Sequence, residues 1–596
     1  MLECDLIMKG GVTSGVVYPN AIAEVAETYR LRDIGGTSAG AIGAVFASAA
    51  EYRRQTTAPG GDTMAGFKAI RSVAKELGTV MQSLFQPSPP FRTVFSIAMG
   101  FLDRSSSAGP VPPFLRPLLV GFWWQWSVAL AAGIATGATG ALSGNGWLLV
   151  ATVLLGIIVC AALALGLVGL TLVKLVAKDL PKYDFGICSG LFQDNPTKPG
   201  FTDWIADKID LIAGNVDSAG RPQTPLTVGQ LLDQNIRVAA MTTDLSSGRP
   251  YQLPLKARLH LFSRTEFSDL FPERVVNALA LEENRFETDT PGLPKDLYWL
   301  PVDRDFPVVL VARISLSLPG LIQAVPLYRF DDGVRTGPDG QAEIRRCLFS
   351  DGGISSNFPI HFFDALLPAR PTFGISLGSW EQSRHGDERV VLPKLWKQSS
   401  NLPIRPIRGA VGFLFAILDA AKDWQDTLQS LLPGYAERIV EIRLDGDHEG
   451  GLNLNMGADV IAKLSELGTL AGKKLVTEFD FDEHRYRRAL SLLPEVEESL
   501  EGFSAAYDAP RESAASGRTY QEILTEYEPK SYKGNSPQWR REVLDAFTNR
   551  LATIGRDAAI AQKAPGRRSV RKGETPAVEA SLRLIAGTDR APKDMG

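Results

Sequence analysis

Residues 31–49 read LRDIGGTSAGAIGAVFASA, and this stretch decides the fold class. Its first four residues are typical of a short buried strand, and two glycines follow them. Apolar residues then recur at helical spacing, at Ile42, Val45, Phe46 and Ala49. A strand, a glycine turn and a helix in this order predict an α/β unit with a parallel sheet.

The turn of this unit contains the motif Gly36-Thr37-Ser38-Ala39-Gly40, which matches the G-x-S-x-G nucleophile elbow. In such an elbow the serine sits on a strained strand-to-helix turn, and small neighbours are needed because bulky ones would clash with the backbone. The following helix N-terminus favours negative charge beside the serine. Ser38 is therefore the candidate nucleophile.

A second strand and glycine turn lie upstream, where residues 4–8 (CDLIM) are followed by Gly10, Gly11 and Gly15. Backbone N–H groups at Gly10 and Gly11 can point at a developing oxyanion. An ordinary tight turn is the alternative. A phosphate loop is disfavoured, because KGGVTSG matches neither the P-loop pattern nor G-x-G-x-x-G.

A third motif, SDGGISSNFP at 350–359, places Asp351 at the end of a predicted strand and before two glycines. An aspartate there can accept the serine proton if it lies within hydrogen-bond reach. A simple Asp-Gly turn is the alternative. His361 follows ten residues later and leaves a Ser-His-Asp triad open.

These three motifs, in this order, resemble the patatin-like phospholipase family: GGVTSG (10–15), GTSAG (36–40) and DGG (351–353). Two further stretches are similar to that family, MTTDLSSG (241–248) and SLSLPGLIQAVPL (315–327). The resemblance spans roughly residues 5–380. It implies a patatin-type three-layer α/β/α sandwich.

The resemblance also implies a mechanism. Ser38 attacks an ester carbonyl, Asp351 acts as general base and then returns the proton to the leaving alcohol, and the amides of Gly10 and Gly11 hold the oxyanion. Such a Ser-Asp dyad uses no cofactor, metal or histidine, so a helix-surface or packing role is preferred for His361. The substrate it implies is a membrane phospholipid or lysophospholipid. The glycines that support the motifs are Gly15, Gly36, Gly40, Gly352 and Gly353.

Two other functions stay open. The loop departs from the family pattern at Lys9 and at Ser14, where the family carries a basic residue. A membrane-anchored scaffold or signalling protein with a degenerate hydrolase domain is therefore the main alternative. A soluble-type esterase or thioesterase with the same dyad is the other.

A long uncharged stretch between Arg116 and Lys174 predicts an inserted transmembrane hairpin. The turn cluster at 143–146 divides it into spans at roughly 120–142 and 147–173. Basic residues flank both ends and none lies in the turn, so both ends and the catalytic domain are expected to be cytoplasmic. A hydrophobic pair of helices buried in a soluble core is the alternative.

The remaining sequence completes the predicted organisation. Short strand-like runs recur at 237–245, 306–318, 347–353 and 372–378. The predicted units are a patatin-like domain in two parts (1–113 and 178–385), the hairpin (114–177), a mainly helical C-terminal region (386–555) and a disordered basic tail (556–596). The net charge of −4 gives no reason to expect a nucleic-acid partner, and the four scattered cysteines suggest no disulfide framework. The oligomeric state is not predicted.

Overall fold

The fold was analysed on a computed structural model. It describes residues 1–573 except 12, 103–113, 143, 194–197, 332, 334–341, 395–406, 408–412, 414–415, 417–419, 421–429, 431, 433, 447–448, 451–452, 455, 514–515, 529–535 and 567.

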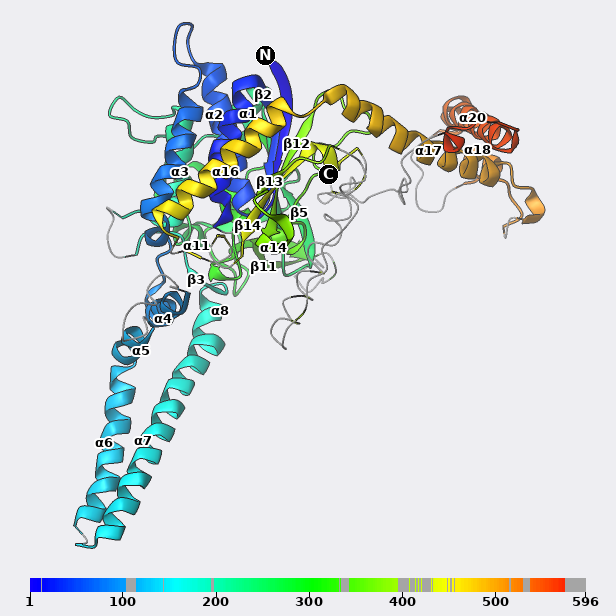
Figure 1. The fold of residues 1–596 in the computed structure, drawn as a ribbon. Coiled ribbons are helices and arrows are strands. Elements are labelled where there is room, and N and C mark those ends of the chain that lie inside the picture. The colour runs from blue at the N-terminus through cyan, green and yellow to red at the C-terminus, as the bar shows by residue number, and fades with distance from the viewer. Residues whose placement is uncertain are drawn as a thin grey trace.

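A mixed sheet of twelve strands forms the centre of the molecule (Figure 1). Its order is β13-β14-β12-β1-β2-β4-β11-β10-β6-β8-β7, with β5 also paired to β4. The strands from β14 to β4 are parallel to their neighbours, and those from β4 to β7 are antiparallel. The bounds are β1 Leu2–Met8, β2 Tyr29–Gly36, β4 Arg237–Asp244, β5 Arg249–Leu253, β6 His260–Ser263, β7 Arg285–Phe286, β8 Leu297–Trp299, β10 Val325–Asp331, β11 Glu343–Asp351, β12 Thr372–Trp380, β13 Val390–Val391 and β14 Ile439–Asp445.

Helices cover one face of the parallel strands. They are α1 Tyr18–Thr28, α2 Ala39–Thr56, α3 Ala65–Leu84, α9 Phe201–Ala213, α13 Val308–Ser315 and α16 Ala458–Thr477. Side chains alternate along a strand, so Leu6 and Met8 of β1 join the large core on this face, whereas Ile7 packs on the other face against Phe358 and Ile360. The segment after β11 therefore covers the second face over Ile7. The chain is a mixed α/β protein, and the patatin-type three-layer arrangement remains a prediction.

Two predicted elements are corrected. Residues 306–318 were expected to form a strand, but Val308–Ser315 is the helix α13, and all eight of its residues are buried. A helix buried on every side has no polar face, so its period cannot be read from the sequence. The C-terminal region predicted as mainly helical also contributes β13 and β14 to the sheet.

The predicted disordered tail is corrected at its start. The long helix α17 (Phe481–Tyr507) packs on α20 (Asp545–Lys563), which continues beyond residue 556. Ser569 Oγ then donates to Glu497 Oε2 at 2.7 Å. The Ala-, Arg- and Gln-rich end of α20 favours helix once α17 covers one side of it. Residues 574–596 lie outside the described residues.

The predicted membrane segment forms two helices that project from the body (Figure 1). Helices α6 (Trp123–Ala141) and α7 (Gly146–Lys174) pack antiparallel: Gln125 Nε2 lies 3.3 Å from Thr171 Oγ1 near one end, and Gly133 faces Gly156 near the middle. The apolar side chains of α7 are largely exposed in the chain alone, and this exposure does not fit the alternative of a pair buried in a soluble core.

Only one of these helices is by itself long and apolar enough to cross a membrane, namely Gly146–Lys182, with 37 residues. Helix α6 meets the same criteria only together with α5 (Leu115–Gly121), from which it is bent by 76°. One candidate span is therefore present, and the second span and the topology remain predictions. The other helices are α4 Arg92–Leu102, α8 Leu180–Lys182, α10 Val228–Asp233, α11 Arg264–Ser268, α12 Glu273–Leu279, α14 Gln382–His385, α18 Tyr520–Thr525 and α19 Pro537–Trp539.

Candidate active site

Ser38 occupies a strained turn between β2 and α2. Its backbone has φ 55° and ψ −125°, a conformation that non-glycine residues rarely adopt, and its side chain is buried. The small flanking residues are required, because a Cβ at Gly36 would lie 2.9 Å from Met8 O, and one at Gly40 would lie 2.9 Å from Lys9 O and closer still to Met8 O. The predicted elbow geometry is thus present at Ser38.

The backbone N–H groups predicted to act as oxyanion donors are only in part available for that role. The N–H of Gly10 donates to Asn357 O at 2.7 Å, so it is occupied and does not fit the predicted role. Among the described residues, no backbone bond is made by the N–H of Gly11 or by that of Ala39, the first residue of α2. The first N–H groups of a helix have no partner within the helix, so Gly11 and Ala39 are the better pair of donors.

Asp351 ends β11 on the same side of the sheet as Ser38. Cys347 and Phe349 precede it at alternate positions and point into the helix-covered core, so Asp351 points to that side too. In the register of the sheet, Thr242 of β4 pairs with Asp351, and Ala240 of β4 pairs with Gly36. Ser38 follows Gly36 by two residues, in the turn that leaves β2. Asp351 and the strand that leads to Ser38 therefore both border β4.

The turn after α13 contacts both candidate residues directly. The hydroxyl of Ser315 accepts a hydrogen bond from the N–H of Ser38 at 3.0 Å. Two residues later, Ser317 O accepts one from the N–H of Asp351 at 3.0 Å. One short segment thus fixes the backbone of both, a role at the site that its sequence does not signal.

The loop after β11 is held in place at both ends. Asp351 Oδ1 accepts from the N–H of Gly353 at 2.6 Å, and Thr243 Oγ1 donates to Asp351 O at 3.1 Å. Gly352 lies against Met241 O, where a Cβ would clash. Farther along, Asn357 binds Gly10, so the three motifs meet at one place in the structure. Gly15 also lies at this place, against Ala39. A Cβ at Gly15 would be 2.8 Å from the Cβ of Ala39.

His361 is exposed, whereas Ser38 and Asp351 are each only 4 % exposed. It follows Ile360, which packs on the opposite face of the sheet from Ser38. This placement favours the dyad over the triad. The described residues contain no group of three or more His, Cys, Asp or Glu side chains that could hold a metal ion.

Arg313 of α13 is a fully buried cation with only neutral hydrogen-bond acceptors. Its Nε donates to Thr202 Oγ1 at 3.1 Å, Nη1 donates to Ser317 Oγ at 2.7 Å, and Nη2 donates to the carbonyls of Ser189 and Gln323 at 3.0 Å. No carboxylate among the described residues lies within ion-pair distance of it, and burial lowers the pKa of Arg313 to about 9. Arg313 thus holds the Ser317 turn against the segment that returns from α7.

Replacing Arg313 by methionine is expected to lower the rate at which Ser38 reacts with a fluorophosphonate by about ten-fold or more. The change leaves several buried acceptors unsatisfied, at about 1–3 kcal/mol each, and releases the turn that fixes Asp351. Arg438→Met is the matched control, because Arg438 is equally buried but binds Asp364. Both variants are compared well below their unfolding temperatures. Equal labelling rates in the two variants would contradict a positioning role for Arg313.

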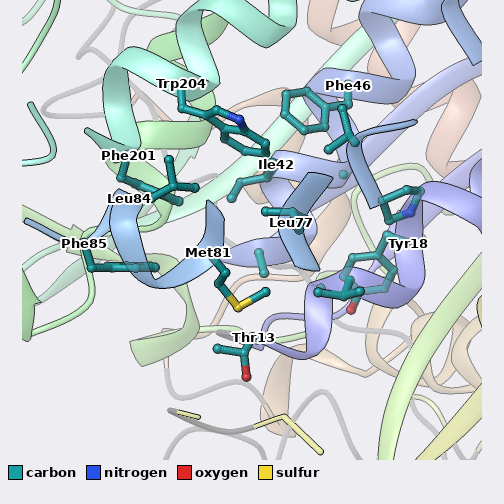
Figure 2. A pocket seen from close by; sticks show the side chains of 16 residues that line it. Thr13, Tyr18, Ile42, Phe46, Leu77, Met81, Leu84, Phe85, Phe201 and Trp204 are labelled. Atoms are coloured by element: carbon teal, nitrogen blue, oxygen red, sulfur yellow. The ribbon is translucent and has the colours of Figure 1, made fainter. Parts of the chain in front are cut away.

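An apolar pocket lies within the helical layer (Figure 2), and Ala39, the residue after the candidate nucleophile, is part of its lining. Thr13 of the loop after β1 and Ala39 line one part of it, and Phe46 and Trp204 of the helical layer also line it. Almost all of the other lining side chains are aliphatic or aromatic. The hydroxyl of Tyr18 is already bound to Lys9 O. The volume of the pocket is small, about 70 Å³, and its lining suits apolar atoms better than polar ones.

The sequence of the chain is similar to that of a named protein over most of its length. No protein-family model matches the chain. It is 33% identical over 567 residues to a protein named RpoH suppressor from Rhizobium meliloti (strain 1021), a match that covers 82% of this chain and 85% of that protein. At this identity and coverage, the chain belongs to the same family as the Rhizobium meliloti RpoH suppressor.

Proposed function

We propose that the chain is a serine acyl hydrolase of the patatin-like phospholipase type, which releases fatty acids from phospholipid or lysophospholipid. In this mechanism Ser38 attacks the ester carbonyl while Asp351 accepts its proton. The amides of Gly11 and Ala39 stabilise the oxyanion, and Asp351 then returns the proton to the leaving alcohol. Water then hydrolyses the acyl-enzyme by the same steps.

The strained backbone of Ser38 is the single observation that carries the proposal. A positive φ at serine costs of order 1–3 kcal/mol, and such strain persists only where the surrounding structure enforces it. Its position at the start of α2 is where a nucleophile elbow places its serine, and the next residue, Ala39, lines an apolar pocket. Glycine adopts this backbone conformation at a lower free energy than serine, so a purely structural turn would favour glycine at this position.

The projecting helices support a membrane substrate. Helix α7 continues from an apolar stretch into Lys174, Lys178 and Lys182 and then enters the body at β3 (Gly186–Cys188). We propose that α6 and α7 cross the bilayer, with the basic residues at the cytoplasmic surface. The catalytic domain would then lie next to the leaflet that supplies its substrate.

The proposal is tested by fatty-acid release from mixed phospholipid and lysophospholipid vesicles by the detergent-purified chain, together with fluorophosphonate labelling. We expect release and a single labelled serine in the peptide that contains residues 36–40. Labelling without release from lipid, but with cleavage of a thioester or short ester, would favour the esterase alternative. Absence of both reactions in a folded chain would favour the scaffold alternative, in which the bond from Gly10 to Asn357 has replaced a working oxyanion loop.

A further inference from the structure

A second cavity, of about 610 Å³, lies on the antiparallel half of the sheet and away from the apolar pocket. It is bordered by the ends of β4 and β10 and the starts of β5 and β11. Four arginines line it, namely Arg249, Arg329, Arg345 and Arg346, against two aspartates, Asp244 and Asp331. We call it the arginine cavity. Its volume is within the range of about 300–1,000 Å³ that small-molecule sites occupy.

Two of these arginines already have acidic partners. Arg346 donates to Asp184 at 2.7 Å and 2.9 Å and to Glu266 at 3.0 Å. Arg345 lies 3.3 Å from Asp331 and 3.4 Å from Glu343. These ion pairs hold the wall of the cavity in place. They also engage Asp331, one of the two aspartates that line it.

The other aspartate is also engaged. Asp244 Oδ1 accepts the N–H of Ser246 at 2.9 Å, and its Oδ2 accepts the hydroxyl of Ser247 at 2.6 Å. Among the described residues it forms no ion pair with an arginine, although it is the register partner of Arg249 across β4 and β5. Asp244 therefore shapes the turn between β4 and β5 and forms no ion pair with the cavity's cations.

Arg249 and Arg329 are the two arginines of the cavity that have not yet been given a partner. Both converge on Tyr251: Arg329 Nη1 donates to its hydroxyl at 2.7 Å, and the guanidinium of Arg249 lies 5.8 Å from the centre of its ring. Neither has a carboxylate within ion-pair distance among the described residues. Beneath them, His260 pairs with Arg329 across the strands, and burial together with Arg329 lowers the pKa of His260 to about 3, so it is neutral at pH 7. Among the described residues, the two guanidinium groups thus have Tyr251 as a shared neighbour and no ion-pair partner.

The arginine cavity also lies close to the base of the projecting helices. Asp184, the partner of Arg346, follows α8 by two residues, and α8 directly continues α7. The Arg346–Asp184 ion pair thus links one wall of the cavity to the segment that follows these helices.

We propose that the arginine cavity binds a phosphate-bearing anion through Arg249 and Arg329. Guanidinium groups present paired N–H donors that match phosphate oxygens, and Tyr251 holds both side chains ready for such a contact. The anion can be the headgroup of an anionic lipid or a soluble phosphorylated compound, since the recognising chemistry is the same. The site is separate from Ser38 and does not depend on the proposed hydrolase activity.

The test uses the full chain in neutral-detergent micelles at constant low ionic strength. Binding of inorganic phosphate is measured by calorimetry, and binding of phosphatidic acid, with phosphatidylcholine as the blank, is measured in mixed micelles. The variant R249Q/R329Q is compared with R258Q/R285Q, which removes the same charge. Arg258 also lies over a ring, that of Trp299 at 5.5 Å, and Arg285 is paired with Glu282, so the control matches in chemistry but lies outside the cavity.

We expect saturable binding in the wild type and the control and at least ten-fold weaker binding in R249Q/R329Q. Binding of phosphatidic acid without inorganic phosphate would assign a lipid headgroup, and the reverse would assign a soluble ligand. Protection of Arg249 and Arg329 from phenylglyoxal by the bound probe gives a second measurement on the wild-type chain. Failure of the wild type to bind either probe, or equal binding by R249Q/R329Q, would overturn the proposal.

Discussion

Ser38→Ala is expected to abolish fatty-acid release, with a loss of about 10⁴-fold or more, and to remove fluorophosphonate labelling completely. Without the hydroxyl no acyl-enzyme can form, and the remaining groups only hold the substrate. The measurement is initial-rate release from vesicles, with the fold checked by thermal unfolding. Ser48→Ala is the matched control, because Ser48 is a buried serine of α2 whose hydroxyl donates to Ala44 O.

The backbone strain at Ser38 adds a second expectation for the same position. Ser38→Gly should be as inactive as Ser38→Ala but more stable, by about 1 kcal/mol, because glycine adopts φ 55° without a steric penalty. Full activity in Ser38→Ala would remove Ser38 from the mechanism. A glycine variant less stable than the alanine variant would show that the elbow is not strained.

Asp351→Asn is expected to lower fatty-acid release by about 10³-fold or more while the chain stays folded. Asparagine keeps an oxygen that can accept the N–H of Gly353, but it cannot take the proton from Ser38. Labelling of Ser38 should slow in parallel, since the fluorophosphonate also needs an activated hydroxyl. The loss should be mainly in kcat, because Asp351 is buried beside β4, away from the lining of the apolar pocket.

His361→Ala separates the dyad from the triad in the same assay. His361 is exposed and follows residues that pack on the opposite face of the sheet, so its removal should change release by less than about three-fold. A folded but inactive His361→Ala would make the mechanism a triad. It would also revise the resemblance to the patatin-like family.

Much of the local structure around the site was predictable from the sequence. The strand before Ser38, the helix after it and the strand that ends at Asp351 all form where the residue patterns predicted them. These elements depend on contacts within a few residues, such as helical spacing of apolar side chains and small residues in a tight turn. The two helices of the projecting segment were also predictable, because the uncharged stretch that forms them is continuous along the chain.

The sequence by itself thus determined the α/β class, the elbow at Ser38 and a helix apolar enough to cross a membrane. Only the tertiary structure decided that α13 is a helix, that Gly10 is bound to Asn357, and that Arg313 supports the turn that holds Ser38 and Asp351. Each of these depends on burial or on hydrogen bonds between segments distant in sequence. Local patterns carry no signal for such contacts, because the partners meet only after the sheet has assembled.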